Sequence, residues 1–390
     1  MLLVWLFSNP TTTKGNPLTT MIRNRVTTAP KVVALVPAYN EEAGIEQTIR
    51  SLMNQSVPFE YVMVIANNCR DRTVKIVRNL QQEFGYYHLR LVDVPENPDK
   101  KSGALNVGFA MVDHTEIDYV FSMDGDTVVH RDINLYGLQK LESDESIGGT
   151  CSAYRTRRIE STATNRWQKL LWRVQNVEFG LANAWRAENW FSARVLPGVA
   201  VMYRTSALLD VQRLHGDGTV WQNNHLVEDY RLTLELKDIG WKAMSSFDMV
   251  SWSDVPLKLN GTGGLWQQRI RWYSGTVDEL RQRGLMRHSR YEMFTVFLMP
   301  MNLLFRLLLL VAYAMLLMQG KNVQLMSVFL ILPVLASIMM LAKFRTYGDR
   351  QDSTQYLLVG SLAIEAYNIY REVMYTYSIW LSYFRPQRGW

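Results

Sequence analysis

Residues 31–53 read KVVALVPAYNEEAGIEQTIRSLM. The apolar run at 32–36 has the length of a buried strand and ends at Pro37. A helical pattern follows, in which Ile45 is succeeded by apolar residues four, seven and eight positions later. Asn40 has the residue type and position of an N-cap for this helix. We therefore expect a buried strand, a short polar turn and an amphipathic helix.

The same alternation continues along the first third of the chain. Further strands are expected at residues 61–66, 88–94 and 119–123, with helices at 73–84 and 102–111. Strands that alternate with helices indicate an α/β domain with a parallel sheet, whose ligands bind beyond the carboxyl ends of the strands.

Polar clusters at residues 39–42, 67–71, 100–102 and 124–126 each follow a predicted strand or begin a predicted helix. We expect them to meet at one rim of the sheet and to form a site of nucleotide size. The chain contains neither GxGxxG nor GxxxxGKS/T, so the usual phosphate cradles of dinucleotide-binding folds and P-loop ATPases are excluded. A different phosphate-binding device is needed.

Asp124 and Asp126 stand one residue apart directly after the predicted strand at 119–123. Two carboxylates at a strand end can hold a hard divalent cation, Mg²⁺ or Mn²⁺, which in turn neutralises a diphosphate. The alternative is a simple turn, because Gly125 lies between them.

Glu228 and Asp229 begin a predicted helix that has Leu232 and Leu236 on one face and ends at Gly240. Acidic residues in a first turn often do no more than stabilise the helix dipole. A carboxylate at this position can also deprotonate an acceptor hydroxyl. From the residues alone, both interpretations stay open.

Residues 268–272 read QRIRW. An amide, two guanidinium groups and an indole can bind a diphosphate and stack on a sugar. The same residue types are also typical of a membrane-interface belt.

The composition changes after residue 293, where long apolar runs begin. The stretches 293–318 and 323–342 are each near the roughly 20 residues that cross hydrocarbon, and they predict a helical hairpin. The stretch 356–384 is either a third span or an interfacial helix, because three of its residues are costly in lipid: Glu365, Arg371 and Glu372.

Basic residues place the loops on either side of this hairpin in the cytoplasm by the positive-inside rule. They are Arg281, Arg283, Arg287 and Arg290 before the first span, and Lys343, Arg345 and Arg350 after the second. Residues 1–7 are too short to span a bilayer and lack signal-peptide flanks. We therefore expect a multi-pass membrane protein whose globular part is cytoplasmic.

The formal net charge of +6 does not predict a nucleic-acid partner, because the basic residues gather near the apolar stretches and form no stripe interleaved with aromatics. Attraction to anionic membrane lipid explains the charge better. The two cysteines, Cys69 and Cys151, are too few for a disulfide framework, so a reducing compartment fits.

Taken together, the motifs resemble those of family 2 inverting glycosyltransferases, especially the membrane-integrated synthases of cellulose, hyaluronan, chitin and poly-N-acetylglucosamine. In chain order they are PAYNEE at 37–42, KSGALN at 101–106, DGDT at 124–127, ED at 228–229 and QRIRW at 268–272. The resemblance covers about residues 31–272. It implies a GT-A fold, with a mixed, mainly parallel sheet flanked by helices, and transfer of a sugar from a nucleotide-sugar donor, with UDP as the expected nucleotide.

The resemblance also implies residue roles. Asp229 is expected to be the general base, with Glu228 beside it in the catalytic pair. Asp124 and Asp126 are expected to bind Mg²⁺ or Mn²⁺ with the diphosphate. Residues 197–200 match the segment on the acceptor side. The expected donor-binding residues are Pro37, Tyr39, Glu41, Asn67, Lys101, Asp124, Gln268, Arg271 and Trp272.

Two departures from the family pattern bear on the substrate. Asn67 stands where many relatives carry an acidic residue that contacts uracil, and an amide accepts hydrogen bonds less strongly than a carboxylate. Many polymerising relatives also have membrane helices before the catalytic domain, and the sequence predicts none before Lys31. We therefore expect transfer to a lipid carrier, a short glycan or another acceptor near the bilayer rather than translocation of a long polymer.

These inferences divide the chain into an extension at 1–30, a GT-A domain at 31–273, an interfacial segment at 274–292 and a membrane region at 293–390 with two or three spans. The expected function is metal-dependent sugar transfer to a glycan, lipid or other acceptor at the cytoplasmic membrane face. Two alternatives are transfer to a protein or nucleic acid, and a non-catalytic, membrane-tethered module that binds nucleotide sugars.

Overall fold

The computed structural model describes residues 29–157, 164–223, 225–284, 288–320, 335, 339 and 353–385. Several expectations fall outside these described residues. They are the extension up to residue 28, Arg287, nearly all of the second apolar stretch at 323–342, and the basic loop that follows it.

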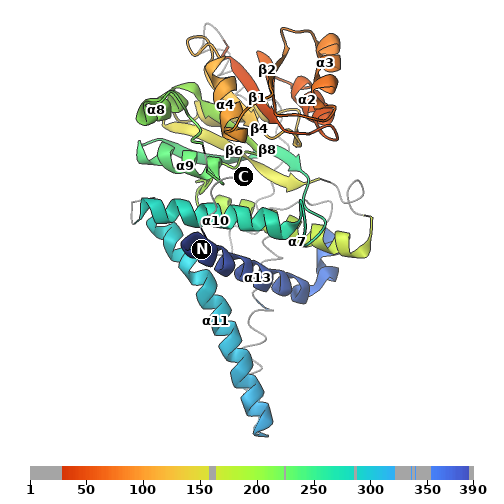
Figure 1. The fold of residues 1–390 in the computed structure, drawn as a ribbon, viewed down its shortest axis with the longest axis vertical. Helices are drawn as coiled ribbons and strands as arrows, with labels where there is room; N and C mark the ends of the chain where they lie inside the picture. Colours follow the sequence, from red (N-terminus) through yellow and green to blue (C-terminus); the bar gives the residue numbers. More distant parts are fainter. Residues whose placement is uncertain are drawn as a thin grey trace, which may run out of the picture.

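One mixed sheet of eight strands forms the centre of the molecule, in the order β3-β2-β1-β4-β7-β6-β8-β5 (Figure 1). The first four of these strands are parallel, β7 is antiparallel to both of its neighbours, and β8 is parallel to β6. The strands are β1 (Val32–Ala38), β2 (Tyr61–Asn67), β3 (Leu89–Val94), β4 (Tyr119–Met123), β5 (Val128–Val129), β6 (Ile147–Thr156), β7 (Ala200–Arg204) and β8 (Lys242–Ser253).

Helices cover both faces of the sheet, and this explains why β1 reads as a continuous apolar run. Along β1, Val32, Ala34 and Val36 face one core, while Val33 and Leu35 face the other. The first core is closed by α2 (Ile45–Met53), α3 (Thr73–Phe84) and α5 (Ile133–Glu142), and the second by α4 (Lys100–Ala110), α8 (Thr205–His215) and α9 (Glu228–Asp238).

The strands and helices expected before residue 123 are present, with ends that shift by one or two residues. The N-cap prediction for Asn40 is wrong. The helix begins at Ile45 after Gly44, and Asn40 has a left-handed φ of 54°. Its side chain instead accepts a hydrogen bond from the backbone N–H of Arg70 (2.8 Å), which ties the loop after β1 to the loop after β2.

Three long helices lie together below the sheet in the view of Figure 1. They are α7 (Arg166–Glu188), α10 (Leu265–Arg283) and α13 (Ser353–Phe384). Helix α10 continues without a break through residue 273, where we expected a domain boundary. Helix α13 packs along α10 with Met374 and Leu381 buried, so the stretch at 356–384 lies against the body over much of its length.

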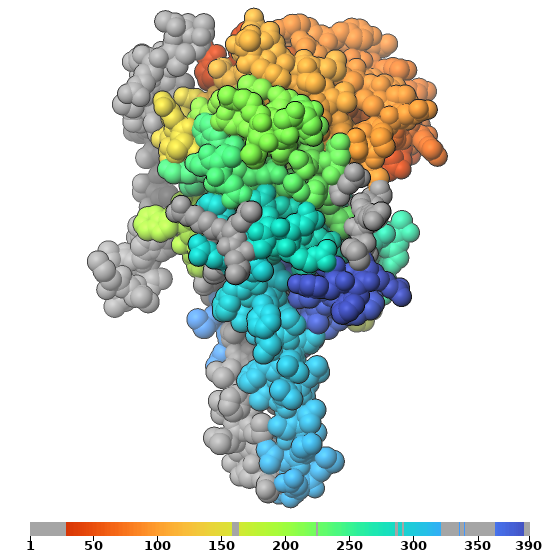
Figure 2. Space-filling view, turned by 60° about the vertical axis from the view of Figure 1, so that its left-hand side comes forward, coloured from red at the N-terminus to blue at the C-terminus, as the bar shows by residue number. Residues whose placement is uncertain are grey.

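Helix α11 (Arg290–Met318) projects from the body as a stalk (Figure 2). Among the described residues, it contains the one segment that is long and apolar enough to cross a membrane, Glu292–Met318, with a mean hydropathy of 2.1. The described residues therefore support one candidate span, and they do not support the multi-pass arrangement that we expected.

Candidate active site

The polar clusters after the parallel strands meet at one rim of the sheet, as expected. The backbone N–H of Glu41 donates to Thr73 Oγ1 (2.8 Å), and that of Glu42 donates to Asp71 Oδ2 (3.0 Å). These bonds join the turn after β1 to Thr73 at the start of α3 and to Asp71 in the loop between β2 and α3. The carboxyl ends of neighbouring parallel strands lie at the same edge, so residues 32 and 29 positions apart become neighbours.

An asparagine cluster shapes the next part of the rim. The side chain of Asn97 donates to Asn67 Oδ1 (2.8 Å) and to the carbonyl of Lys100 (2.7 Å). Gly103 leaves room for this side chain, because a Cβ there would lie 2.3 Å from Asn97 Oδ1. Asn67 is 4% exposed, so its amide oxygen points into this cluster, where Asn97 engages it.

Lys101 joins two parts of the site that are distant in sequence. Its ammonium lies 2.5 Å from Asp124 Oδ1, at the end of β4, and 3.1 Å from Glu228 Oε1, at the start of α9. Burial alone would lower the pKa of Lys101, but the carboxylates of Asp124, Glu228 and Asp229 outweigh it and raise that pKa above its ordinary value. Lys101 is therefore a fixed positive charge inside an acidic site.

Three carboxyl groups at this rim, those of Glu41, Asp124 and Asp126, repel one another. Burial, followed by repulsion from Asp126 and Asp124, raises the pKa of Glu41 to about 7. Burial and the charge of Asp124 likewise raise the pKa of Asp126 to about 6. Repelling carboxylates of this kind gain stability when a divalent cation binds between them.

The donor set of Asp124 and Asp126 fits a hard cation such as Mg²⁺ or Mn²⁺, which prefers carboxylate oxygens. Among the described residues, no group of three or more acidic, histidine or cysteine side chains is arranged to hold a metal ion unaided. Two protein carboxylates leave most of the coordination sphere to other oxygens, as happens where Mg²⁺ also binds substrate phosphates.

Asp229 is half-buried and held in one orientation. Its Oδ2 accepts the backbone N–H of Gly198 (3.1 Å), and its Oδ1 accepts the N–H of Tyr230 (2.7 Å). Burial and the adjacent charge of Glu228 raise the pKa of Asp229 to about 6. There is no room for a side chain at Gly198, because a Cβ there would lie 2.6 Å from Lys101 Nζ. The segment at 197–200 thus lies beside this carboxylate.

Helix α10 brings the QRIRW residues to the same region. Gln268, Arg271, Trp272 and Gly275 have the spacing of one helix face. A Cβ at Gly275 would lie 2.8 Å from the side chain of Val227, so α10 touches the residue that precedes α9. Burial by itself would raise the pKa of Glu228, but the charge of Lys101, and after it that of Arg271, lowers this pKa below its ordinary value. The Arg271 charge is therefore close enough to act on Glu228.

The remaining predicted donor-binding residues lie at or under this rim. Tyr39 is 60% exposed on the turn after β1. Pro37 is buried within β1, with its carbonyl oxygen 3.3 Å from the position that a Cβ of Gly125 would take. Tyr39 is therefore accessible to a ligand, whereas Pro37 supports the aspartate turn from beneath.

Three residues that our sequence analysis did not select contact the site. Asn97 orders the rim, and Arg157 donates to the carbonyl of Asp126 (2.7 Å). Glu178 forms an ion pair with Arg269, which lies next to Gln268 in the QRIRW segment. Asn97 occurs in a polar loop after a strand, which is a usable signal, whereas nothing in the sequence distinguishes Glu178 from other glutamates within helices.

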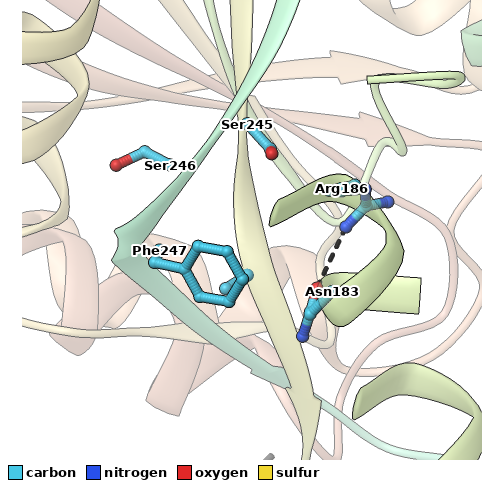
Figure 3. Close-up of a pocket in the computed structure, with 6 residues that line it drawn as sticks. Asn183, Arg186, Ser245, Ser246 and Phe247 are labelled. Carbon is cyan, nitrogen blue, oxygen red and sulfur yellow. Dashed lines mark hydrogen bonds between the residues drawn. The ribbon is translucent and has the colours of Figure 1, made fainter. Parts of the chain in front are cut away.

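A small hollow elsewhere in the body shares no residue with this site. It lies between Asn183 and Arg186 of α7 and Ser245, Ser246 and Phe247 of β8 (Figure 3). It is too narrow to admit a water molecule, and Arg186 within it donates to Asn183 (3.1 Å). The hollow is therefore a packing defect rather than a ligand site.

A sequence profile described as "Glycosyltransferase like family 2" matches residues 30–275, which include every element of the site described above. The chain belongs to this family. A relative among curated proteins is the "Probable glycosyltransferase YdaM" of Bacillus subtilis, 24% identical over 288 residues that make up 71% of this chain and 64% of that protein. Another is the poly-beta-1,6-N-acetyl-D-glucosamine synthase of Staphylococcus aureus, 22% identical over 64% of this chain and 55% of that protein.

This family 2 chain thus spans less than two thirds of the length of these two relatives. Among solved structures, the mannosyltransferase PcManGT of Pyrobaculum calidifontis, in complex with GDP-Man and Mn²⁺, superposes with a TM-score of 0.61 at 17% identity. The superposition covers 93% of this chain and 89% of that one. The likeness confirms a GT-A-like α/β fold for the family 2 domain.

Proposed function

We propose that this protein is a metal-dependent, inverting glycosyltransferase that moves a sugar from a nucleotide-sugar donor to an acceptor near a membrane. One observation carries the proposal. Lys101 contacts both Asp124 and Glu228. The two aspartates proposed to bind the metal, Asp124 and Asp126, therefore lie near Asp229, although they come from different parts of the fold. Membership of the family supports the same reaction class.

In this proposal, Asp124 and Asp126 hold Mg²⁺ or Mn²⁺. The bound cation neutralises negative charge on the diphosphate leaving group. Lys101, whose ammonium lies 2.5 Å from Asp124 Oδ1, would supply a second positive charge to the same phosphates. Arg271 and Gln268 approach from α10, and a guanidinium with an amide suits phosphate oxygens and sugar hydroxyls.

Asp229 is proposed as the general base. The acceptor hydroxyl gives its proton to Asp229 as its oxygen bonds to the anomeric carbon and the bond to the diphosphate breaks. Attack from the face opposite the leaving group inverts that carbon. The raised pKa, about 6, makes Asp229 a stronger base than an ordinary aspartate while leaving it ionised at neutral pH. Glu228 stays paired with Lys101 and keeps that ammonium in place.

The donor is proposed from the family and its relatives. A synthase of an N-acetylglucosamine polymer is among the sequence relatives, which favours a UDP-hexosamine. The structural relative was solved with GDP-Man, so a mannose donor belongs in the same test. In this structure the Asn67 amide oxygen already accepts a hydrogen bond from Asn97, and Asn67 is 4% exposed, so a direct contact with a base would have to use the second lone pair of that oxygen or displace Asn97.

The membrane role rests on α11 and on the arginines that precede it. We propose that Glu292–Met318 anchors the chain, that the rest of the region from 293 to 390 adds further membrane contact, and that residues 31–273 catalyse at the cytoplasmic face. The interfacial segment at 274–292 and the extension at 1–30 complete the proposed division. A lipid-linked acceptor or a short glycan suits a site so close to the anchor.

Full-length protein in detergent, incubated with UDP-N-acetylglucosamine, UDP-glucose and GDP-mannose and a membrane lipid extract, tests the proposal. We expect one donor to release its nucleoside diphosphate with Mn²⁺ or Mg²⁺ and not with EDTA, and mass spectrometry to find a glycosylated product. Donor binding without release would identify a non-catalytic module. Release that is equally fast in EDTA would contradict the proposed metal role.

A further inference from the structure

A glutamate on α7 whose side chain is 14% exposed connects the QRIRW segment to the carboxy-terminal helix. Glu178 Oε2 accepts hydrogen bonds from Arg269 Nη2 on α10 (2.8 Å) and from the Tyr367 hydroxyl on α13 (2.6 Å). Its Oε1 lies 3.3 Å from Arg371 Nε, also on α13. A single carboxylate thus holds one group from α10 and two from α13.

Arg269 also contacts two of the predicted donor-binding residues, Gln268 and Trp272. Its Nη1 donates to Gln268 Oε1 (2.6 Å), and its guanidinium carbon lies 4.3 Å from the centre of the Trp272 ring. Arg269 is fully buried, so its charge has no aqueous alternative to these contacts. A planar guanidinium held by a carboxylate is fixed in orientation, which in turn fixes the groups that it touches.

The electrostatics favour a permanently charged pair. Burial would raise the pKa of Glu178, but Arg269 first and Arg371 next lower it to about 2. The carboxylate therefore stays ionised at physiological pH. Buried ion pairs of this kind add little net stability compared with apolar packing, so a specific geometric role is a better explanation for them than stability alone.

We propose that Glu178 is a positioning residue for donor binding. Through Arg269, it orients Gln268 and Trp272. Its contacts with Tyr367 and Arg371 mean that this orientation depends on the packing of α13 against α7 and α10. The inference rests on the proposed glycosyltransferase function. It adds that α13, remote in sequence from every recognisable motif, is required for an aligned donor site. Glu178 itself touches no substrate.

The test compares Glu178→Gln with wild type in full-length protein in detergent, using the better of UDP-N-acetylglucosamine and GDP-mannose as donor. We expect kcat/KM to fall roughly 10- to 100-fold, because small misplacements of binding groups have effects of this size. Binding of Mn²⁺ alone, measured by calorimetry, should change by less than about threefold, because Asp124 and Asp126 keep their surroundings. Glu83→Gln, which removes an exposed ion pair with Arg50, is the matched control.

A double-mutant cycle separates positioning from general destabilisation. If Glu178 acts in part through Gln268, then Glu178→Gln should lower kcat/KM by a clearly smaller factor in the Gln268→Ala background than in wild type, and the loss that remains is the part transmitted through Trp272. A purely structural loss would multiply with the Gln268→Ala effect, and that result would overturn the inference.

Tyr367→Phe keeps the inference testable if Glu178→Gln folds poorly. It removes only the hydroxyl that donates to Glu178 and leaves the ring in place. We expect it to lower kcat/KM about threefold or more with a change in melting temperature of at most a few degrees. If both Glu178→Gln and Tyr367→Phe have wild-type kcat/KM, this inference is overturned but the proposed function is not. A wild-type protein that transfers no sugar from any donor overturns the proposed function and this inference with it.

Discussion

The ammonium of Lys101 lies 2.5 Å from Oδ1 of Asp124. One of the two aspartates proposed to bind a divalent cation therefore already has a positive partner in the ligand-free protein. Since Lys101 also contacts Glu228, the contact links the motif after β4 to the helix that carries the proposed base. The predictions below follow from this arrangement of charges.

Lys101→Met should make the ligand-free protein less stable and more responsive to metal. Without the ammonium, the carboxylates of Asp124 and Glu228 lose their shared partner, at a cost of about 1 kcal/mol for a pair that is partly open to solvent. Mn²⁺ should then raise the melting temperature more than it does in wild type. Lys31→Met, which breaks an exposed pair with Glu116, is the control, and an equal Mn²⁺ effect in all three proteins would contradict the prediction.

Asp229→Asn should fold normally and lose sugar transfer. The amide cannot accept the acceptor proton, so kcat should fall by about 10²- to 10⁴-fold while binding of donor and metal persists. Steady-state kinetics combined with calorimetry separates the two effects. Asp93→Asn, which alters an exposed pair with Arg78, serves as the control. Near-wild-type turnover in Asp229→Asn would show that another group is the base.

Asp126→Asn should weaken binding of Mn²⁺ and nucleoside diphosphate by about tenfold or more, since it removes one of the two proposed protein ligands. In metal-free buffer the same variant should melt at or above the wild-type temperature, because it relieves repulsion among Asp126, Asp124 and Glu41. Calorimetry and thermal melts in EDTA measure the two outcomes. Unchanged metal affinity would remove Asp126 from the proposed site.

The pH dependence of stability follows from the raised pKa values of Asp126 and Asp229, both about 6, and of Glu41, about 7. A carboxyl whose pKa is higher when folded than when unfolded binds its proton more tightly in the folded state. Its contribution to stability is therefore fully present below the ordinary pKa of 3.8 for Asp or 4.5 for Glu, and it is lost as the pH rises from there through 6 to 7. In metal-free buffer, the melting-temperature advantage of Asp126→Asn over wild type should be larger at pH 7.5 than at pH 5.

The pH dependence of transfer should run in the opposite direction. Asp229 must be ionised to accept a proton, so kcat should fall as the pH drops below about 6, the value to which burial and Glu228 raise its pKa. A pH–rate profile with saturating donor and Mn²⁺ measures this limb. A flat profile between pH 5 and 8 would be inconsistent with Asp229 as the base.

Gly275→Ala should destabilise the protein by about 1–3 kcal/mol, although alanine is the better helix former. A Cβ at this position would lie 2.8 Å from Val227 and 2.9 Å from Leu226, so α10 must move away from the start of α9. Chemical denaturation measures the loss, and kcat/KM should fall with it because Arg271 moves too. Gln282→Ala, on an exposed part of α10, should leave both unchanged.

Much of the fold was predictable from local patterns. The strands at β1, β2, β3 and β4 are short apolar runs, and the amphipathic helices between them keep their spacing whatever their surroundings. The motif order was sufficient to indicate the family, which the profile match confirms. The N-cap at Asn40 was mispredicted because its side chain bonds to another loop, and local sequence does not encode that partner.

The candidate site was predictable as a set of residues and not as a set of contacts. Sequence placed Lys101, Asp124 and Glu228 near strand ends and a helix start, because parallel strands direct their carboxyl ends to one edge. It did not show that Lys101 lies between the two carboxylates, since that depends on how β4 and α9 pack. The hydrogen bond from Asn97 to Asn67 Oδ1 could not be predicted from the sequence either.

The sequence by itself determined the α/β alternation, the family motifs and the apolar stretch of α11, because periodicity and composition act over short separations. Only the tertiary structure decided that α13 lies against α10 and that Glu178 connects it to Arg269. The physical reason is separation along the chain: Glu178 and Arg371 are brought together by the packing of three helices, and no local preference of either residue specifies that meeting.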